Sequence, residues 1–178
     1  MLLVLTQGSF LRGLKSNVYN GERHRSNMKT LQVTNGDLAL DSGGRLQFLQ
    51  GTNKLVQDLA LWLQEPYGIG FTTPSFGSTL PGLIGGESTA STIALVQSEV
   101  QRIISLYQSQ QIISLQNAQN LSQLGNWNKS EIINSINNID VQQNYTSILV
   151  NVSITTLSNT NVSFSLFISS DGVQVNSG

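Results

Sequence analysis

The chain of 178 residues contains no cysteine and a single histidine. Without cysteine it can form neither a disulfide framework nor a thiolate metal site. His24 would have to build a catalytic triad or a zinc site from a segment without clear periodicity. The glycine-rich run at 81–87 lacks the Lys-Ser/Thr pair of a phosphate-binding loop. We therefore expect no catalytic residue, no metal and no cofactor.

Charged side chains are also scarce. They make up 11% of the chain, well below the roughly 25% of typical soluble domains. The net charge of −1 gives no case for nucleic acid, and no apolar run reaches the roughly 20 residues that cross a bilayer. Because Asn, Gln, Ser and Thr fill the gap, little repulsion separates this chain from its neighbours. We expect protein partners, and neither a nucleic acid, a membrane nor a small-molecule substrate.

Ten acidic residues leave room for the two nearby carboxylates of a glycoside hydrolase. Asp58, Glu65, Glu87 and Glu99 each have a simpler explanation, as solvated charges or as charges favoured by a helix dipole. The chain is therefore not expected to be an enzyme, and a hydrolase is kept as an alternative.

Residues 1–29 show neither helical nor strand periodicity and hold five of the nine basic residues. The composition predicts an extended basic arm, with a solvated leader as the plainer alternative. The opening run, MLLVL, follows no cationic segment and is interrupted by Gln7 and Gly8, so it is a poor signal peptide.

The next segment, 30–51, alternates apolar and polar residues in short pairs. The apolar pairs are Leu31 and Val33, Leu38 and Leu40, and Leu46 and Phe48. Asn-Gly at 35–36 and Ser-Gly-Gly at 42–44 separate them, and such glycines supply the positive φ angles of tight turns. This pattern predicts a β-hairpin or meander in which Asp37 and Asp41 cap their own backbone.

The first predicted helix has one apolar stripe, formed by Leu55, Val56, Leu59, Trp62 and Leu63. Thr52 or Asn53 is expected to cap its start. The helix runs through Glu65, because the residue before Pro66 is pushed out of the helical region.

The second predicted helix has an apolar face with spacings of three and four, formed by Ile93, Val96, Val100, Ile103, Ile104 and Tyr107. Ser88 or Thr89 is expected to cap its start. No Gly or Pro interrupts the sequence before about Leu124, so we expect the helix to continue that far. A short third helix is predicted from Ser130 to Asn138.

The C-terminal part of the chain carries the clearest strand signal, two alternating runs joined by a turn at 158–161. The alternating apolar residues are Ile148, Val150, Val152 and Ile154 in one run and Val162, Phe164, Leu166 and Ile168 in the other. A hairpin alone is marginal in water, so its apolar side must pack on the helices. The predicted fold class is α+β, with a small, mainly antiparallel sheet packed on two main helices, preceded by the extended arm and the N-terminal β-hairpin.

Between the two helices lies a loop with a distinctive set of residues, Gly68, Pro74, Phe76 and Gly77. With its flanking helices, the tyrosine at 107 and the strand pair, it resembles the small baseplate wedge protein of contractile phage tails. That family includes the sheath initiator and its counterpart in type VI secretion baseplates. The resemblance covers residues 30–170, most firmly 52–107.

The resemblance also implies how the loop is built. Pro74 and Gly77 would fix a turn in which Phe76 folds back onto the core. Tyr67 and Phe71 would pack beneath this loop, as hydrophobic plugs that support the surface.

One feature departs from the family pattern. The family follows its helix tyrosine with Glu-Pro-Arg, which faces neighbouring wedge proteins. Here Tyr107 is followed by three uncharged polar residues, Gln108, Ser109 and Gln110. A polar contact with wedge proteins is therefore expected in place of the ion pair. A helical insertion at 108–140 then separates Tyr107 from the strands, within a wedge-like domain at 52–178.

The resemblance implies a structural role in a contractile tail baseplate, as the sheath initiator that templates polymerisation of the sheath. The partners would be the sheath protein and the wedge, hub and tube proteins, with multiple copies, about six, around the tail axis. The protein would belong to the virion of a bacteriophage, assembled in the cytoplasm of its bacterial host.

Strand addition is the mechanism that the resemblance implies, because sheath subunits add strands to neighbouring sheets. An open strand edge offers unpaired backbone groups to an arriving strand. We expect the hairpin strands at 146–156 and 161–169, with their alternating apolar residues, to receive it. The arm and the helical insertion would contact wedge or hub proteins. The alternatives are a tail adaptor that never touches the sheath and a peptidoglycan-cleaving lysozyme.

Overall fold

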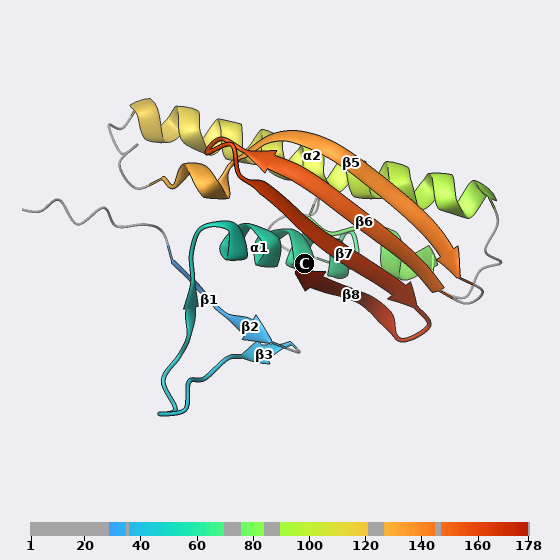
Figure 1. The fold of residues 1–178 in the computed structure, drawn as a ribbon, viewed down its shortest axis with the longest axis horizontal. Helices are drawn as coiled ribbons and strands as arrows, with labels where there is room; N and C mark the ends of the chain where they lie inside the picture. The colour runs from blue at the N-terminus through green and yellow to red at the C-terminus, as the bar shows by residue number, and fades with distance from the viewer. Residues whose placement is uncertain are drawn as a thin grey trace, which may run out of the picture.

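A computed structural model describes residues 29–34, 36–69, 76–83, 90–120, 127–144 and 147–177. Residues 1–28 of the arm predicted at 1–29, Phe71, Pro74 and the expected cap at Ser88 or Thr89 lie outside the described residues. The predicted fold class is confirmed, since a small antiparallel sheet packs on two helices (Figure 1).

The N-terminal half contains the short strands β1 (Thr30–Leu31), β2 (Val33–Thr34), β3 (Asp37–Leu38) and β4 (Phe48–Leu49), then helix α1 (Thr52–Gln64) and the 3-10 turn η1 (Leu80–Leu83). The C-terminal half contains helix α2 (Ala90–Asn120), the 3-10 turn η3 (Lys129–Glu131), and the strands β5 (Ile133–Asn144), β6 (Ser147–Thr156), β7 (Asn161–Ser169) and β8 (Gly172–Ser177).

The last four strands form one antiparallel sheet in the order β5-β6-β7-β8. β6 and β7 are the hairpin expected from the sequence, paired from Ile148 opposite Ile168 to Thr155 opposite Asn161. Every apolar residue predicted to face inward from this hairpin is buried. The strict alternation of the two strands therefore identified their inner face correctly.

The short helix predicted at 130–138 is wrong, and two bulges in β5 explain the error. Only η3 is helical there, and the strand already begins at Ile133. The register between β5 and β6 shifts after Ile133 and again after Ile136. Each shift inserts an extra residue. Ile136 and Ile139 are therefore three positions apart, as on a helix, although both pack against the core.

The two helices cover the inner face of the sheet, α2 along β5 and α1 along β8 (Figure 1). α2 continues to Asn120, in agreement with the expected long helix, and residues 121–126 lie outside the described residues. Phe164 is 1% exposed between these layers, so its truncation to alanine would cost about 3–5 kcal/mol. In the part of the chain that is described, no helix is long and apolar enough to span a bilayer.

The cap predicted for α1 at Thr52 or Asn53 is wrong. Gly51 occupies the cap position and no side chain caps the helix from within its own sequence. Instead the carboxylate of Glu131, in η3, accepts the Gly51 N–H at 2.8 Å. A negative charge at this end of the helix is favourable because the first N–H groups have no helical partner.

The loop between the helices confirms the roles predicted for Phe76 and Gly77. Phe76 packs edge-on against Trp62, with 4.6 Å between the ring centroids. Gly77 has a φ of 95°, and a Cβ there would lie 2.7 Å from the carbonyl oxygens of Glu65 and Pro66. No other residue fits this position without moving the backbone.

Tyr67 does not pack beneath the loop as predicted. It is 53% exposed, and the guanidinium carbon of Arg102 lies 5.4 Å from its ring centroid. The neighbouring Gly68 has a φ of 82° and turns the chain at this point.

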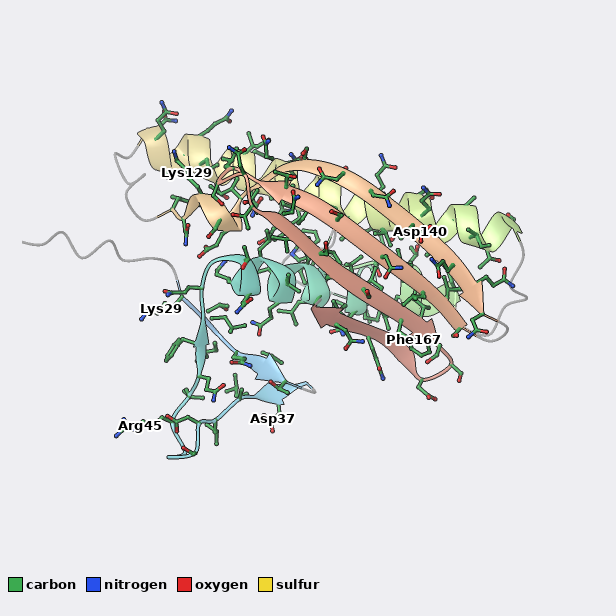
Figure 2. The ribbon with its side chains drawn as sticks, in the orientation of Figure 1. Lys29, Asp37, Arg45, Lys129, Asp140 and Phe167 are labelled. Atoms are coloured by element: carbon green, nitrogen blue, oxygen red, sulfur yellow. The ribbon has the colours of Figure 1, made fainter. Side chains whose placement is uncertain are left out.

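The N-terminal meander, residues 30–49, projects from the molecule beside α1 (Figure 1). β1 pairs with β4 and β2 with β3, which confirms the short strands expected there. Asp37 and Asp41 cap their own backbone as predicted. Figure 2 shows Arg45 at the tip of the meander, directed away from the sheet.

One side chain of α1 anchors this meander. The side-chain oxygen of Gln57 accepts the Val33 N–H at 2.8 Å, and its amide nitrogen donates to the Leu31 carbonyl at 2.8 Å. The apolar residues farther out remain exposed, namely Leu38, Leu40, Leu46 and Phe48.

Candidate functional site: the outer edge of strand β8

The strands predicted to receive a partner strand are the two central strands of the sheet. β6 is paired with β5 and β7, and β7 is paired with β6 and β8. The eight predicted contact residues are buried in the core, namely Ile148, Val150, Val152, Ile154, Val162, Phe164, Leu166 and Ile168. The sequence therefore placed the open edge on the wrong strands. The outer edges of this sheet belong to β5 and β8.

β8 is the strand that sequence reasoning missed. Its only signal is short, since Val173 and Val175 alternate with Gln174 and Asn176 after a turn at 170–171. It pairs with β7 from Gly172 opposite Ser169 to Ser177 opposite Phe164.

The register of β8 determines which backbone groups are left unpaired. A two-residue loop closes on a hydrogen-bonded pair, here Ser169 and Gly172, and such pairs alternate along an antiparallel ladder. The N–H and C=O groups of Val173 and Val175 consequently point away from β7. Among the described residues, none outside β7 forms a hydrogen bond with the backbone of β8.

A groove of about 900 Å³ runs beside this edge, between β8, α1 and the meander. Figure 1 shows these three elements on the same side of the molecule. α1 lines the groove with Asn53, Val56, Gln57, Ala60, Leu61 and Gln64. The meander contributes Gln32, Val33, Gly36 and Leu49, so the Gln57 anchor positions one side of the groove.

The chemistry of the groove suits an extended peptide. Val173 and Val175 are only partly buried, whereas Leu166 and Ile168, beside them on β7, are fully buried. One further strand would pair with the outward backbone groups and complete the cover of both valines. Asp171 is the one charged residue that lines the groove in the described chain. Glycoside hydrolysis needs two carboxylates, and the described residues bring one to this groove.

The opposite edge of the sheet is closed by α2. Gln111, on α2, accepts the Ile133 N–H at 3.0 Å and donates to the Glu131 carbonyl at 2.6 Å. Two further glutamines of the helix donate to carbonyls of β5: Gln108 to Ile133 and Asn134, and Gln97 to Ile139. Together with the two bulges, these contacts leave β5 poorly suited to accept a strand.

The residues at the position of the family Glu-Pro-Arg motif face different surroundings. Tyr107 lies against the core, where its hydroxyl donates to the Asp58 carboxylate at 2.9 Å. Burial raises the pKa of this hydroxyl far above its usual value, and the charge of Asp58 adds to the effect. Gln108 binds β5, Gln110 is partly buried, and Ser109 is exposed. A wedge contact at this position stays a prediction, and Ser109 is its most accessible residue.

Two carboxylates do approach one another at the start of α1. Lys54 lies 2.8 Å from an Asp58 oxygen and 3.7 Å from a Glu131 oxygen. Both acids already have structural partners, Tyr107 and Gly51, and neither lines the groove. No group of three or more potential metal-ligating side chains occurs among the described residues.

Glu99 was expected to be solvated or favoured by a helix dipole, and both explanations are wrong, because it is buried and lies beyond the first turn of α2. It is 9% exposed, accepts the Thr79 N–H at 2.7 Å, and forms an ion pair with Arg102 at 2.7 Å. The hydrogen bonds from Arg102 hold the pKa of Glu99 below its usual value, against the opposing effect of burial. The same guanidinium donates to the Gly77 carbonyl, so the pair fixes the loop that precedes η1.

Comparison with protein-family models, with curated proteins and with solved structures found no match to this chain.

Proposed function

We propose that this chain is a structural component of a contractile-tail baseplate that starts sheath assembly by accepting a strand at the outer edge of β8. The observation that carries the proposal concerns Val173 and Val175, whose outward backbone groups pair with no described residue. They lie beside a groove to which the described chain brings one charged side chain. The resemblance of the loop and helices to the baseplate wedge family supplies the partner, a strand of the sheath subunit.

The energetics favour repeated weak contacts. Each backbone hydrogen bond contributes a net 0.5–1.5 kcal/mol, roughly, and burial of the two valines adds to this. A single added strand would bind modestly, and several copies in a ring would bind cooperatively through their combined valency. The exposed apolar residues of the meander, the arm at 1–28 and the end of α2 are then the surfaces for wedge, hub and tube proteins.

The substitution Val175→Pro tests the proposal. Proline removes an outward N–H and places its ring on the outer edge, while Gln174 and Asn176 keep their bonds with β7. With the sheath, tube and baseplate proteins of its own particle, the variant should form baseplates and tubes that lack sheath, as seen by electron microscopy.

Val141→Pro is the matched control. Val141 lies on β5 in the same alternation as Ile139, whose carbonyl faces α2, so the same change removes an outward N–H at the closed edge. We expect normal sheath on this variant. Normal sheath on a folded Val175→Pro chain would overturn the proposal and favour a tail adaptor. Loss of sheath in both variants at unchanged melting temperatures would overturn the assignment to β8.

A further inference from the structure

We propose that the outer face of the four-stranded sheet, opposite the two helices, binds a neutral glycan around Phe167. This face is distinct from the edge of β8, where the proposed function places a sheath strand. Phe167 lies on β7 near the turn to β8 (Figure 2). It is 37% exposed, whereas the residues before and after it on β7, Leu166 and Ile168, are buried in the core. Its ring is therefore directed away from the helices.

The register of the sheet places Phe167 within a row of four side chains across the outer face. Leu149 of β6 lies on one side of it and Gln174 of β8 on the other, and Gln142 of β5 lies beyond Leu149. Neighbouring strands are about 4.8 Å apart, so this Phe167 row is about 14 Å long. The row has an apolar centre, formed by the ring and the leucine, and a carboxamide at each end.

A second, polar row lies beside the Phe167 row, two residues away along each strand. Its members are Asp140, Asn151, Ser165 and Asn176. Ser165 donates to the side-chain oxygen of Asn151 at 2.8 Å, and Gln142 donates to the Asp140 carboxylate at 2.7 Å. The carboxamides of Gln174 and Asn176 form no hydrogen bond with the described residues. Amide donors and acceptors are therefore available beside the ring.

The charge of the four strands limits the class of ligand. They contain no lysine or arginine, and Asp140 is their one acidic residue. Nucleic acids and anionic membranes are bound through basic residues, so neither suits this face. A second protein sheet would need an apolar face to pack on, whereas the side chains around Phe167 and Leu149 are mostly uncharged and polar. The ligand that fits is uncharged, rich in hydroxyl groups and apolar on one side.

A β-glucopyranose ring has these properties. Its axial C–H groups form an apolar face that can lie on an aromatic ring, and its equatorial hydroxyl groups point outward to planar amides. A β-1,4-linked glycan is a flat ribbon of such rings. It would lie along the Phe167 row, with one sugar on the ring and its neighbours over Leu149 and Gln174. One aromatic platform implies weak binding, which several copies in an assembly would strengthen.

Saturation-transfer NMR on the full chain tests this site with two neutral ribbons, cellohexaose and chitohexaose. The C–H protons of at least one of them should receive saturation from the protein. Hexagalacturonate, an anionic hexasaccharide, should receive much less, because no basic residue of the four strands could pair with it. No transfer to either neutral ribbon would overturn the proposal, and so would equal transfer to the anionic chain.

Two variants of Phe167 separate stacking from general hydrophobicity. Phe167→Leu keeps an apolar side chain in β7 and removes the ring, so the dissociation constant for the bound ribbon should rise about two- to tenfold. Phe167→Tyr keeps the ring and should bind as the parent does. Tyr67→Leu is the matched control, because it removes a ring that is 53% exposed in the loop between the helices. It should leave glycan binding unchanged.

Unchanged binding by a folded Phe167→Leu chain, or an equal loss in Tyr67→Leu, would overturn the assignment to this face. Melting temperatures show whether each variant is folded. These measurements need no sheath, and sheath assembly needs no glycan. A parent chain that binds neither ribbon but starts sheath therefore removes the glycan site and keeps the proposed function. A chain that binds a ribbon but leaves sheath growth unaffected by Val175→Pro gives the reverse result.

Discussion

The two outer strands of the same sheet differ in how far other elements cover their backbone. β5 has 12 residues, two register shifts, and a helix whose glutamine side chains bind its backbone. β8 has six residues in continuous register, and a groove runs beside it. A long open edge is an aggregation hazard, whereas a short one can be kept for a chosen partner. The difference indicates that β8, and not β5, is the edge of this sheet that can accept a further strand.

The helix closes β5 through its periodicity. Gln97 and Gln108 are 11 residues apart, which is about three helical turns, and Gln111 follows nearly one turn later. All three therefore lie on one face of α2 and meet the same strand. A glutamine carries both a donor and an acceptor, so it can satisfy a strand backbone as another strand would.

The largest expected loss of stability comes from removing the hydrogen bonds of Gln111, the buried glutamine of α2 that binds β5. Gln111 is 7% exposed, and Gln111→Leu would leave the Ile133 N–H and the Glu131 carbonyl buried without partners. At about 1–3 kcal/mol for each such group, the free energy of unfolding should fall by about 2–4 kcal/mol in urea denaturation.

The same change at the other edge is the control for this prediction. Gln174 is exposed and its side chain forms no hydrogen bond with the described residues. Gln174→Leu should therefore alter the free energy of unfolding by no more than about 0.5 kcal/mol. If Gln111→Leu and Gln174→Leu lose equal free energy of unfolding, side chains do not satisfy the backbone of β5 better than that of β8.

The sequence predicted the centre of the sheet and missed its edges, for a physical reason. β6 and β7 have neighbours on both sides and one buried face, so Val152 and Phe164 belong to strictly alternating runs. In β5 the bulges replace alternation with a helical spacing around Ile136. In β8 only Val173 and Val175 alternate, which is too short to distinguish from a loop.

The candidate site was less predictable than the fold. Whether a strand lies at the edge of a sheet depends on which elements pack beside it in the fold. The local sequence pattern of a strand does not reveal this. Gln108 was expected to contact wedge proteins and Gln111 was assigned no role, yet both bind β5. The roles of Phe76 and Gly77, which the resemblance of their loop implied, agree with the structure, where the ring contacts Trp62 and the close approach of the backbone admits only glycine.

Lowering the pH should destabilise the segment around Thr79, η1 and β8 before the rest of the sheet. η1 packs against β8, and Glu99 holds the residue before it, Thr79. The folded pKa of Glu99 lies below the usual 4.5, so its stabilisation is complete above that value and is lost as pH falls through the folded pKa. Glu99→Gln should therefore be about 1 kcal/mol less stable than the parent at pH 7, with a smaller deficit at about pH 3.

Urea denaturation at both pH values measures this difference, with the exposed Glu65→Gln as the control. Hydrogen exchange should show the acid-induced loss of protection at Thr79 and β8 before β5. A deficit that does not change with pH would mean that Glu99 acts through packing and not through its charge.

Removing the exposed part of the contact between α2 and β5 should change stability little and should mainly change self-association. Gln108 donates to the Asn134 carbonyl at 3.0 Å and Gln97 to the Ile139 carbonyl at 3.4 Å. Water can replace both donors, so the double variant Gln97→Ala, Gln108→Ala should lose only about 1 kcal/mol. It would, however, present carbonyls of β5 to a second molecule and should self-associate in sedimentation velocity.

A control with Gln101→Ala and Gln116→Ala removes two exposed glutamines of α2 that bind nothing among the described residues, and it should remain as monodisperse as the parent. If the Gln97, Gln108 double variant also stays monodisperse, the two bulges alone would suffice to exclude a partner strand from β5. The glutamines would then only stabilise the fold, and the contrast between the edges would rest on backbone geometry.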